Sequence, residues 1–129
     1  MESEIHEYLM SLAGTAWDYK AEWGWERYRV GGKMYAATMK PSDVFAPEYA
    51  NHPLLNLKCD PLEAEFLREQ YADILPGFYS DKRHWISIRL DGEVPHGLIF
   101  KLCDASYRLV CARLPVKVRR AIEESAKSC

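Results

Sequence analysis

Hydrophobic and polar residues alternate strictly along one stretch late in the chain. The hydrophobic positions are Ile86, Ile88 and Leu90, and the intervening positions are Trp85, Ser87 and Arg89. A period of two places the two sets on opposite faces of a strand, so the pattern predicts a half-buried strand over residues 84–90. Basic residues lead into it, namely Lys82, Arg83 and His84.

A hairpin is predicted where Gly31 and Gly32 separate two further alternating segments, Trp25–Val30 and Lys33–Met39. Two glycines between strands favour a tight turn, because the turns that suit hairpins need positive φ. Counting back from this turn pairs Tyr28 with Tyr35 on one face. It places the pairs Arg29 with Met34 and Arg27 with Ala36 on the other face.

Two more strands complete the predicted sheet. Leu55, Leu57 and Cys59 alternate with Asn56 and Lys58, which indicates a strand over residues 54–59. Residues 41–53 before it contain three prolines and are expected to form a loop. A short strand over residues 77–80, followed by a turn at residues 81–83, is expected to pair with the strand at 84–90.

Four helices are predicted from capping residues and apolar stripes. Ser3 is a candidate cap for a first helix over residues 4–13, with Ile5, Leu9 and Leu12 facing inward. Asp60, Pro61 and Glu63 form the start of a second helix, with an apolar stripe of Leu62, Phe66, Leu67 and Tyr71. A long helix is expected over residues 95–114, and a last one over residues 116–127 after Pro115.

The predicted order of elements defines the fold class. A helix, three strands, a helix, two strands and closing helices indicate an α+β protein of α-β(3)-α-β(2)-α order. We expect a mostly antiparallel five-stranded sheet with helices on one face. A chain of 129 residues is expected to form one compact domain spanning residues 1–129.

Composition and charge indicate an ordinary soluble protein. Hydrophobic residues make up 48% of the chain and charged residues 28%, and the net charge is −2. Any site for a polyanion would therefore have to be local. The N-terminus is acidic and no segment approaches the ~20 apolar residues of a membrane span. We expect a cytoplasmic protein with no membrane partner, in which Cys59, Cys103, Cys111 and Cys129 are reduced.

The two faces of the predicted sheet differ in chemistry. One is hydrophobic and forms a core, through Tyr28, Val30, Tyr35, Ala37, Leu55, Leu57, Cys59, Ile86, Ile88 and Leu90. The other has cations and indoles without an acid, through Trp25, Arg27, Arg29, Lys58, Trp85 and Arg89. Proteins that bind single-stranded nucleic acid use rings for stacking and cations for phosphates. Exposed sheet faces also carry Arg and Lys for solubility and edge protection, with indoles packed on arginine stems.

The segment from Trp17 to Trp25 is dense in aromatic residues, with Tyr19 and Trp23 between them. Large rings at this density usually fill the edge of a core, because they bury extensive apolar area. The alternative is a ligand or partner site, for which Trp17, Trp23 and Trp25 are the candidates.

Catalytic motifs are missing from the chain. No G-x-S-x-G, H-E-x-x-H, P-loop or G-x-G-x-x-G pattern occurs, and no histidine has metal-ligand spacing. Cys59 and His84 lie on neighbouring predicted strands and form one candidate nucleophile pair. A cysteine in such a strand is more often a small core residue. We therefore predict no enzyme activity, no cofactor and no metal.

Several motifs in order resemble the MmcQ/YjbR family of bacterial proteins. They are Val30-Gly-Gly-Lys-Met-Tyr, Asn56-Leu-Lys-Cys-Asp-Pro, Pro76-Gly-Phe-Tyr, Lys82-Arg-His-Trp, Leu90-Asp-Gly and Ser106-Tyr-Arg-Leu-Val. The resemblance covers residues 5–122. It implies a compact α+β domain of the order derived above, similar in outline to type III secretion chaperones. The family is described as a DNA-binding group in which two hairpin wings contact DNA, here residues 25–39 and 77–90.

Two functional expectations follow. The leading one is a monomeric DNA-binding protein that contacts double- or single-stranded DNA through the basic face and the wings. Its candidate residues are Arg27, Arg29, Lys33, Lys58, Lys82, Arg83, His84, Trp85 and Arg89. The alternative is a protein-interaction or small-molecule-binding module that uses Trp17, Trp23 and Trp25.

Overall fold

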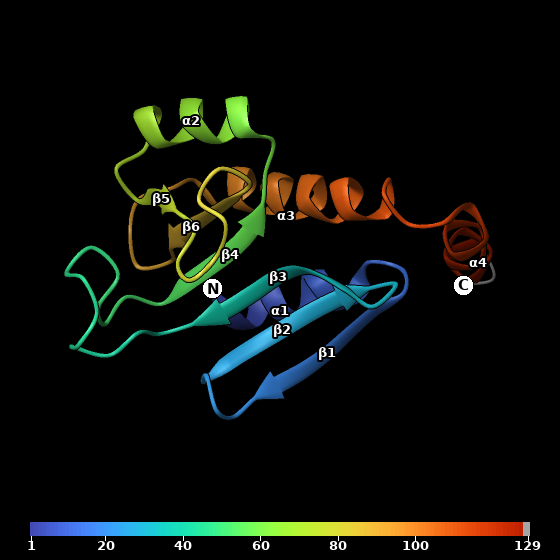
Figure 1. The fold of residues 1–129 in the computed structure, drawn as a ribbon, viewed down its shortest axis with the longest axis horizontal. Helices are drawn as coiled ribbons and strands as arrows, with labels where there is room; N and C mark the ends of the chain where they lie inside the picture. The colour runs from blue at the N-terminus through green and yellow to red at the C-terminus, as the bar shows by residue number, and fades with distance from the viewer. Residues whose placement is uncertain (128–129) are drawn as a thin grey trace.

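A computed structural model describes residues 1–127, which form an antiparallel sheet with helices packed on one face (Figure 1). The elements are α1 (Glu2–Ser11), β1 (Thr15–Lys20), β2 (Trp25–Val30), β3 (Lys33–Met39), β4 (Leu54–Lys58), α2 (Pro61–Gln70), β5 (Ile74–Pro76), β6 (Trp85–Arg89), α3 (His96–Cys111) and α4 (Val116–Lys127). The strand order is β1-β2-β3-β4-β6-β5, and every neighbouring pair is antiparallel. The α+β class is confirmed, with six strands in place of five.

The strand that the sequence pattern missed is β1, at the edge of the sheet beside β2. It overlaps the first part of the Trp17–Trp25 segment, whose rings were expected to fill a core edge. That expectation was wrong for three of its four rings, because Trp17, Tyr19 and Trp23 are exposed and Trp25 alone is buried. An edge strand with exposed aromatic residues gives no clear alternation between buried and polar positions, so periodicity did not reveal it.

One face of the sheet, called here the helix face, is covered by α1, α2 and α3. The core between these layers contains Ile5, Leu9, Leu55, Ile86 and Ile99 among other residues. A buried serine on α3 joins the helix to two strands. Ser106 donates its hydroxyl to the carbonyl of Tyr35 at 2.6 Å and accepts the N–H of Lys58 at 2.9 Å. In Figure 1, α1 and α3 lie behind the strands and α4 extends beyond the end of the sheet.

The predicted hairpin is present, but its register changes within it. Gly31 and Gly32 both have positive φ, and Arg29 pairs with Met34 as expected. A bulge then inserts Tyr35, so that Tyr28 pairs with Ala36 and not with Tyr35. Beyond the bulge, each residue of β3 therefore faces the side of the sheet opposite to the one expected from the sequence. For this reason Ala37, expected in the main core, lies on the opposite side.

Other boundaries also differ from expectation. Helix α1 begins at Glu2, its N-cap is Met1, and no side chain caps it, so the prediction of Ser3 as cap was wrong. Asp60 does cap α2, but Leu62 and Phe66 of its expected apolar stripe are exposed. The short strand expected at residues 77–80 lies instead at β5, and residues 77–84 form a loop.

Two further observations concern the whole described chain. No helix within residues 1–127 is long and apolar enough to cross a membrane. Cys59, Cys103 and Cys111 are free thiols, and Cys129 lies outside the described residues.

Candidate binding groove

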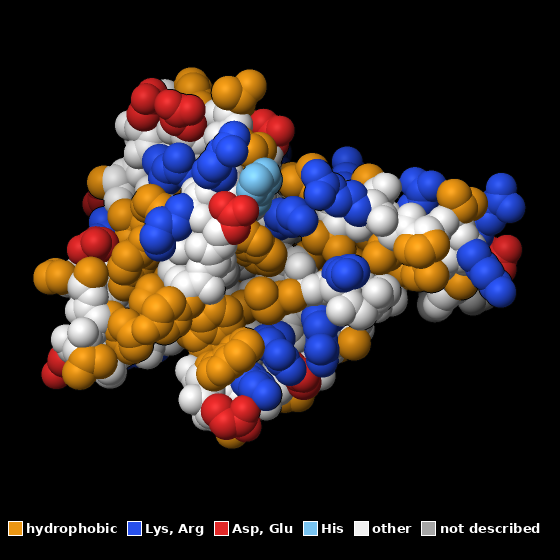
Figure 2. All heavy atoms as spheres, viewed as in Figure 1, with side chains coloured by type: hydrophobic (Ala, Val, Ile, Leu, Met, Phe, Trp, Pro, Cys, Tyr) orange, Lys and Arg blue, Asp and Glu red, His pale blue; other side chains and the backbone are white. Residues whose placement is uncertain are grey.

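The sheet face opposite the helices, called here the loop face, is partly covered by residues 41–53 and 77–84. This covering was not expected from the sequence. It creates a second apolar cluster, which contains Trp25, Ala37, Met39, Tyr49, Leu54 and Phe78. In Figure 2, which shows this face, hydrophobic side chains form a continuous band across the molecule, with Lys and Arg gathered on both sides of it.

A groove of about 640 Å³ opens within this band. We call it the aromatic groove. The sheet contributes Trp25, Met34 and Met39, and the β1–β2 connection contributes Trp23. The two loops contribute Pro41, Ser42 and Phe45 on one side and Phe78 and Tyr79 on the other. Two charged residues, Glu22 and Lys40, complete the lining.

The rings of the aromatic groove contact one another mainly edge to face. Trp23 and Trp25 have centroids 5.6 Å apart at 72°, and Phe45 meets Phe78 at 5.1 Å and 86°. Such T-shaped contacts stabilise a ring assembly beyond the apolar area that it buries. Trp25 is 6% exposed and fixes the floor, whereas Trp23 and Tyr79 are 57% and 73% exposed. The groove therefore combines a rigid apolar floor with accessible rings at its rim.

A buried polar network holds the wall that contains Phe78. The side-chain amide of Asn56 on β4 donates to the backbone carbonyl of Phe78 at 2.9 Å. The hydroxyl of Ser87 on β6 donates to the side-chain oxygen of Asn56. The same Ser87 oxygen accepts the N–H of Phe78 at 2.8 Å. Asn56 and Ser87 are fully buried. Side chains thus satisfy both backbone groups of Phe78, which explains why residues 77–80 form no strand.

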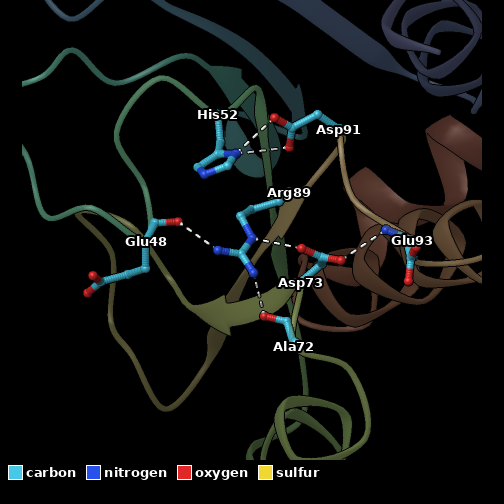
Figure 3. A network of polar contacts seen from close by, with 7 residues as sticks. All are labelled: Glu48, His52, Ala72, Asp73, Arg89, Asp91 and Glu93. Carbon is cyan, nitrogen blue, oxygen red and sulfur yellow. Dashed lines mark hydrogen bonds and ion pairs between the residues drawn. The ribbon is translucent and has the colours of Figure 1, made fainter.

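A second network holds the loop of residues 41–53 against the sheet (Figure 3). Arg89 on β6 donates from Nε to Asp73 at 2.8 Å, and its other nitrogens donate to the carbonyls of Ala72 at 3.0 Å and Glu48 at 3.3 Å. His52 lies 2.8 Å from a carboxylate oxygen of Asp91. Arg89 was predicted to contact DNA. It is instead 19% exposed and occupied in tying the loop down.

Asp73 is the carboxylate at the centre of that network. It accepts the N–H of Glu93 at 2.9 Å as well as the guanidinium of Arg89. The hydrogen bond from Glu93 and the positive charge of Arg89 lower the pKa of Asp73 below its ordinary value. The neighbouring turn needs glycine, because a Cβ on Gly92 would lie within 2.2 Å of the Asp73 carboxyl.

The expectation that the basic face contains no acid was wrong. Asp18 on β1 pairs in register with Arg27, and Arg27 donates two hydrogen bonds to its carboxylate, at 2.9 and 2.6 Å. Arg29 donates to the same carboxylate at 2.7 Å. The hydrogen bond and charge of Arg27, with Arg29, lower the pKa of Asp18. Because β1 was missed from the sequence, this acid was missed with it.

Other candidate DNA contacts lie together near the start of β6. Lys58 pairs with Trp85 in register, and both are half-buried. Lys82 and Arg83 are exposed in the 77–84 loop, where Lys82 donates to the Gly77 carbonyl at 3.0 Å. The remaining two candidates, His84 and Lys33, differ in setting. His84 lies 2.8 Å from Asp81, whereas Lys33 is exposed at the turn between β2 and β3.

The three tryptophans of the alternative site are only partly brought together. Trp23 and Trp25 line the aromatic groove. Trp17 pairs with Tyr28, a core residue of the helix face, and its ring meets His6 edge to face at 5.5 Å. Trp17 therefore belongs to the opposite side of the sheet.

The Cys59–His84 pair lacks the geometry of an activated thiol. The two strands are neighbours, since the Cys59 N–H donates to the His84 carbonyl at 2.8 Å. Burial, however, raises the pKa of Cys59 to about 12, so the thiol is protonated near neutral pH. The His84 ring is hydrogen-bonded to Asp81 instead. Among residues 1–127 no group of three or more His, Cys, Asp and Glu side chains is placed to hold a metal.

The sequence reasoning missed most of the groove lining. Met34 and Met39 were assigned to strands without a role, and Phe45, Phe78 and Tyr79 were assigned to a loop and a short strand. One signal was available, namely aromatic residues inside segments rich in proline and glycine, Val44-Phe45-Ala46-Pro47 and Pro76-Gly77-Phe78-Tyr79. Large rings in loops must pack against another surface or remain exposed as binding groups.

Comparison with known proteins identifies relatives over almost the whole chain. The family model YjbR matches residues 10–109. Uncharacterized protein YjbR of Escherichia coli K12 is 31% identical over 120 residues, covering 93% of this chain and 95% of that protein. Uncharacterized protein YyaQ of Bacillus subtilis 168 is 33% identical over 116 residues, covering 82% of this chain and 94% of that protein.

Solved structures agree with the fold described here. The crystal structure of Deinococcus radiodurans protein DR2400, a DUF419 domain, has a TM-score of 0.80 at 26% identity, covering 95% of this chain and 88% of that one. A crystal structure from Pseudomonas syringae has a TM-score of 0.72 at 23% identity and shows the same fold, covering 84% of this chain and 97% of that one. On the family model and the sequence relatives together, this chain belongs to the YjbR family.

Proposed function

We propose that this protein is a binding module without catalytic chemistry, and that its ligand is a small aromatic or apolar molecule held in the aromatic groove. The observation that supports this most directly is the groove itself. Its volume of about 640 Å³ falls within the roughly 300–1,000 Å³ typical of small-molecule sites. Its lining is mostly apolar and aromatic with a few polar groups, which is also typical of such sites.

The walls of the groove are held before any ligand arrives. The Asn56–Ser87 network fixes Phe78, and Arg89 fixes the opposite loop. A preformed site avoids the ordering cost that otherwise weakens binding. Single exposed apolar residues are ordinary on a protein surface, but a continuous concave patch of rings indicates a binding site.

A thermal-shift screen of small aromatic compounds tests this proposal. A ligand at 100 times its Kd stabilises the folded protein by about 2.7 kcal/mol, which for a chain of this size raises Tm by roughly 10 °C. Tyr79→Ala removes an exposed ring of the groove and should abolish the shift. Tyr19→Ala removes another exposed ring, which lies outside the groove, and should preserve the shift. A screen without hits, or hits unaffected by Tyr79→Ala, would contradict the proposal.

DNA binding is a second candidate, favoured by one specific observation. Within residues 1–127, no carboxylate forms an ion pair with Lys58, Lys82 or Arg83. Lys58 pairs in register with Trp85, whose indole is half-exposed, and Lys82 and Arg83 come just before Trp85 in the chain. Against it, three of the four predicted arginines are paired with acids, Arg27 and Arg29 with Asp18 and Arg89 with Asp73. The surface available for phosphate is therefore smaller than the sequence indicated.

Fluorescence anisotropy across a salt series tests the second candidate with duplex and single-stranded DNA. Each contacted phosphate on duplex should contribute about −0.9 to the slope of log K against log salt. The double variant Lys58→Gln with Arg83→Gln should weaken binding and flatten that slope. Arg120→Gln, an exposed cation on α4, should leave both unchanged. Absence of binding at low salt would exclude this candidate.

A further inference from the structure

We infer that the aromatic groove selects a flat aromatic ring carrying a carboxylate, and that Lys40 is the residue that recognises the anion. This inference rests on the proposed binding function and adds the chemical class of the ligand. It depends on which charged groups at the groove are already paired and which one is not.

The acid of the groove is occupied. Glu22 lies 2.8 Å from Lys20, and the hydrogen bond and charge of Lys20 hold the pKa of Glu22 below its ordinary value. Its carboxylate is therefore ionised and already neutralised by a neighbour. Lys40, the other charged lining residue, has no carboxylate partner within residues 1–127. It is exposed at the end of β3, and Ser42 supplies a hydroxyl to the groove two residues further on.

Aromatic sites often recognise cations, but the charges here oppose that. Lys20 lies 5.4 Å and Arg27 5.6 Å from the centroid of the Trp23 ring. The exposed indole is therefore already in contact with two cations of the protein, where a cationic ligand would otherwise lie. Lys40 would repel a positive ligand as well. A negative group near Lys40 gains an attraction that neutral and positive ligands lack.

The ring component of the ligand follows from the shape and softness of the lining. Met34 and Met39 contribute polarisable thioether side chains to the lining of the groove. Methionine adapts to flat aromatic groups and makes favourable sulfur–ring contacts. Phe45 and Tyr79, one from each loop, line the groove and contact each other edge to face at 5.5 Å. A planar ring with one anionic end therefore matches both the apolar floor and Lys40, the lining cation that has no carboxylate partner within residues 1–127.

Isothermal calorimetry with three ligands of one shape tests the inference. The ligands are 1-naphthoate, neutral 1-naphthalenemethanol and cationic 1-naphthylmethylammonium. Naphthoate should bind most tightly, the neutral alcohol less tightly and the cation least. The affinity for naphthoate should be about tenfold higher than for the alcohol, which is the effect of one charge-assisted hydrogen bond. The preference should weaken as salt rises, because both charges are exposed to solvent.

Two lysine variants assign the preference to its source. Lys40→Met should lower naphthoate affinity to that of the neutral ligand and leave the neutral ligand unchanged. Lys33→Met, an exposed lysine outside the groove, should change neither. Neutral ligand binding as tightly as naphthoate, or no effect of Lys40→Met, would overturn the inference. Displacement of naphthoate by single-stranded DNA would also overturn it, by assigning the groove to nucleotides.

The same measurements separate this inference from the proposed function. If none of the three ligands binds, the small-molecule function itself is refuted. If the neutral compound binds and the anion shows no advantage, the groove is a binding site but the assignment of an aromatic carboxylate is wrong.

Discussion

Replacing Asn56 by leucine should destabilise the protein and loosen one wall of the aromatic groove. Leucine has nearly the same size, so the change removes hydrogen bonds without creating a large cavity. The Ser87 hydroxyl loses its acceptor and the Phe78 carbonyl loses its shorter donor, in a fully buried setting. An unsatisfied buried group costs about 1–3 kcal/mol. Since the Phe78 carbonyl keeps a weaker bond from Ser80 at 3.2 Å, we expect a total of about 2–3 kcal/mol.

Urea denaturation followed by tryptophan fluorescence measures this loss. With a slope of about 1–3 kcal/mol/M for a small domain, the midpoint should fall by roughly 1–2 M. The control Ser80→Ala removes only the longer contacts, 3.2 Å and 3.4 Å, and should shift the midpoint far less. The double variant with Ser87→Ala should cost less than the sum of the two single changes, because the residues share one network. If Asn56→Leu is within about 0.5 kcal/mol of the native protein, the network does not hold the wall as argued.

Three further predictions address pH, thiol chemistry and the hairpin turn. The folded-state pKa of Asp73 is lowered. Its contribution to stability is therefore present above the unfolded pKa of about 3.9 and is lost as pH falls through the folded pKa. Asp73→Asn should flatten the acid side of a curve of unfolding free energy against pH, and an unchanged slope would contradict this. Cys59 should react slowly with iodoacetamide at neutral pH and rapidly after unfolding, because burial raises its pKa to about 12; fast modification of the native protein, mapped by mass spectrometry, would refute it. Gly31→Ala should destabilise the protein by about 1–2 kcal/mol more than Gly32→Ala in the same urea assay. Both glycines have positive φ, but a Cβ on Gly31 would lie 2.7 Å from the Leu114 side chain, whereas a Cβ on Gly32 would have no atom within 4 Å. Equal losses of stability in the two variants would contradict the contact with Leu114.

Sequence periodicity located the strand with the clearest alternation, although its expected half-buried pattern was wrong, because Ser87 on the polar face is also fully buried. Residues 84–90 alternate cleanly, and β6 occupies Trp85–Arg89 within them. The Gly-Gly turn and the Asp60 cap were also recognised, because each has a local conformational requirement that its residue type reveals. The α4 boundaries, Val116–Lys127, agree with the expectation as well, since Pro115 sets the start.

The misses have a common physical cause, which is that long-range contacts overrode local patterns. Tyr35 enters a bulge because its hydroxyl reaches Thr15 and the carbonyl of Leu9, and neither contact is visible from the spacing of the hairpin. Phe78 does not form a strand because side chains from β4 and β6 bind its backbone. Such tertiary preferences are absent from a single segment read alone.

The prediction of the basic face failed mainly because strand β1 was missed. Without β1, Arg27 and Arg29 formed an acid-free face; with it, Asp18 lies directly opposite Arg27. An ion pair formed across strands depends on which strands are neighbours. A list of residue types along one strand therefore overstates the free charge of a sheet face.

The most direct test of ligand binding in the aromatic groove uses the four tryptophans of the chain as internal probes. Each has one indole N–H, and two-dimensional ¹H–¹⁵N NMR resolves such groups individually. On titration with 1-naphthoate, we expect progressive shifts of the Trp23 and Trp25 signals, because both line the aromatic groove. The signals of Trp17, on the helix face, and Trp85, in the DNA-binding candidate cluster, should stay in place. Shifts confined to Trp17 or Trp85, or no shift of Trp23 and Trp25 at saturating ligand, would contradict binding in the aromatic groove.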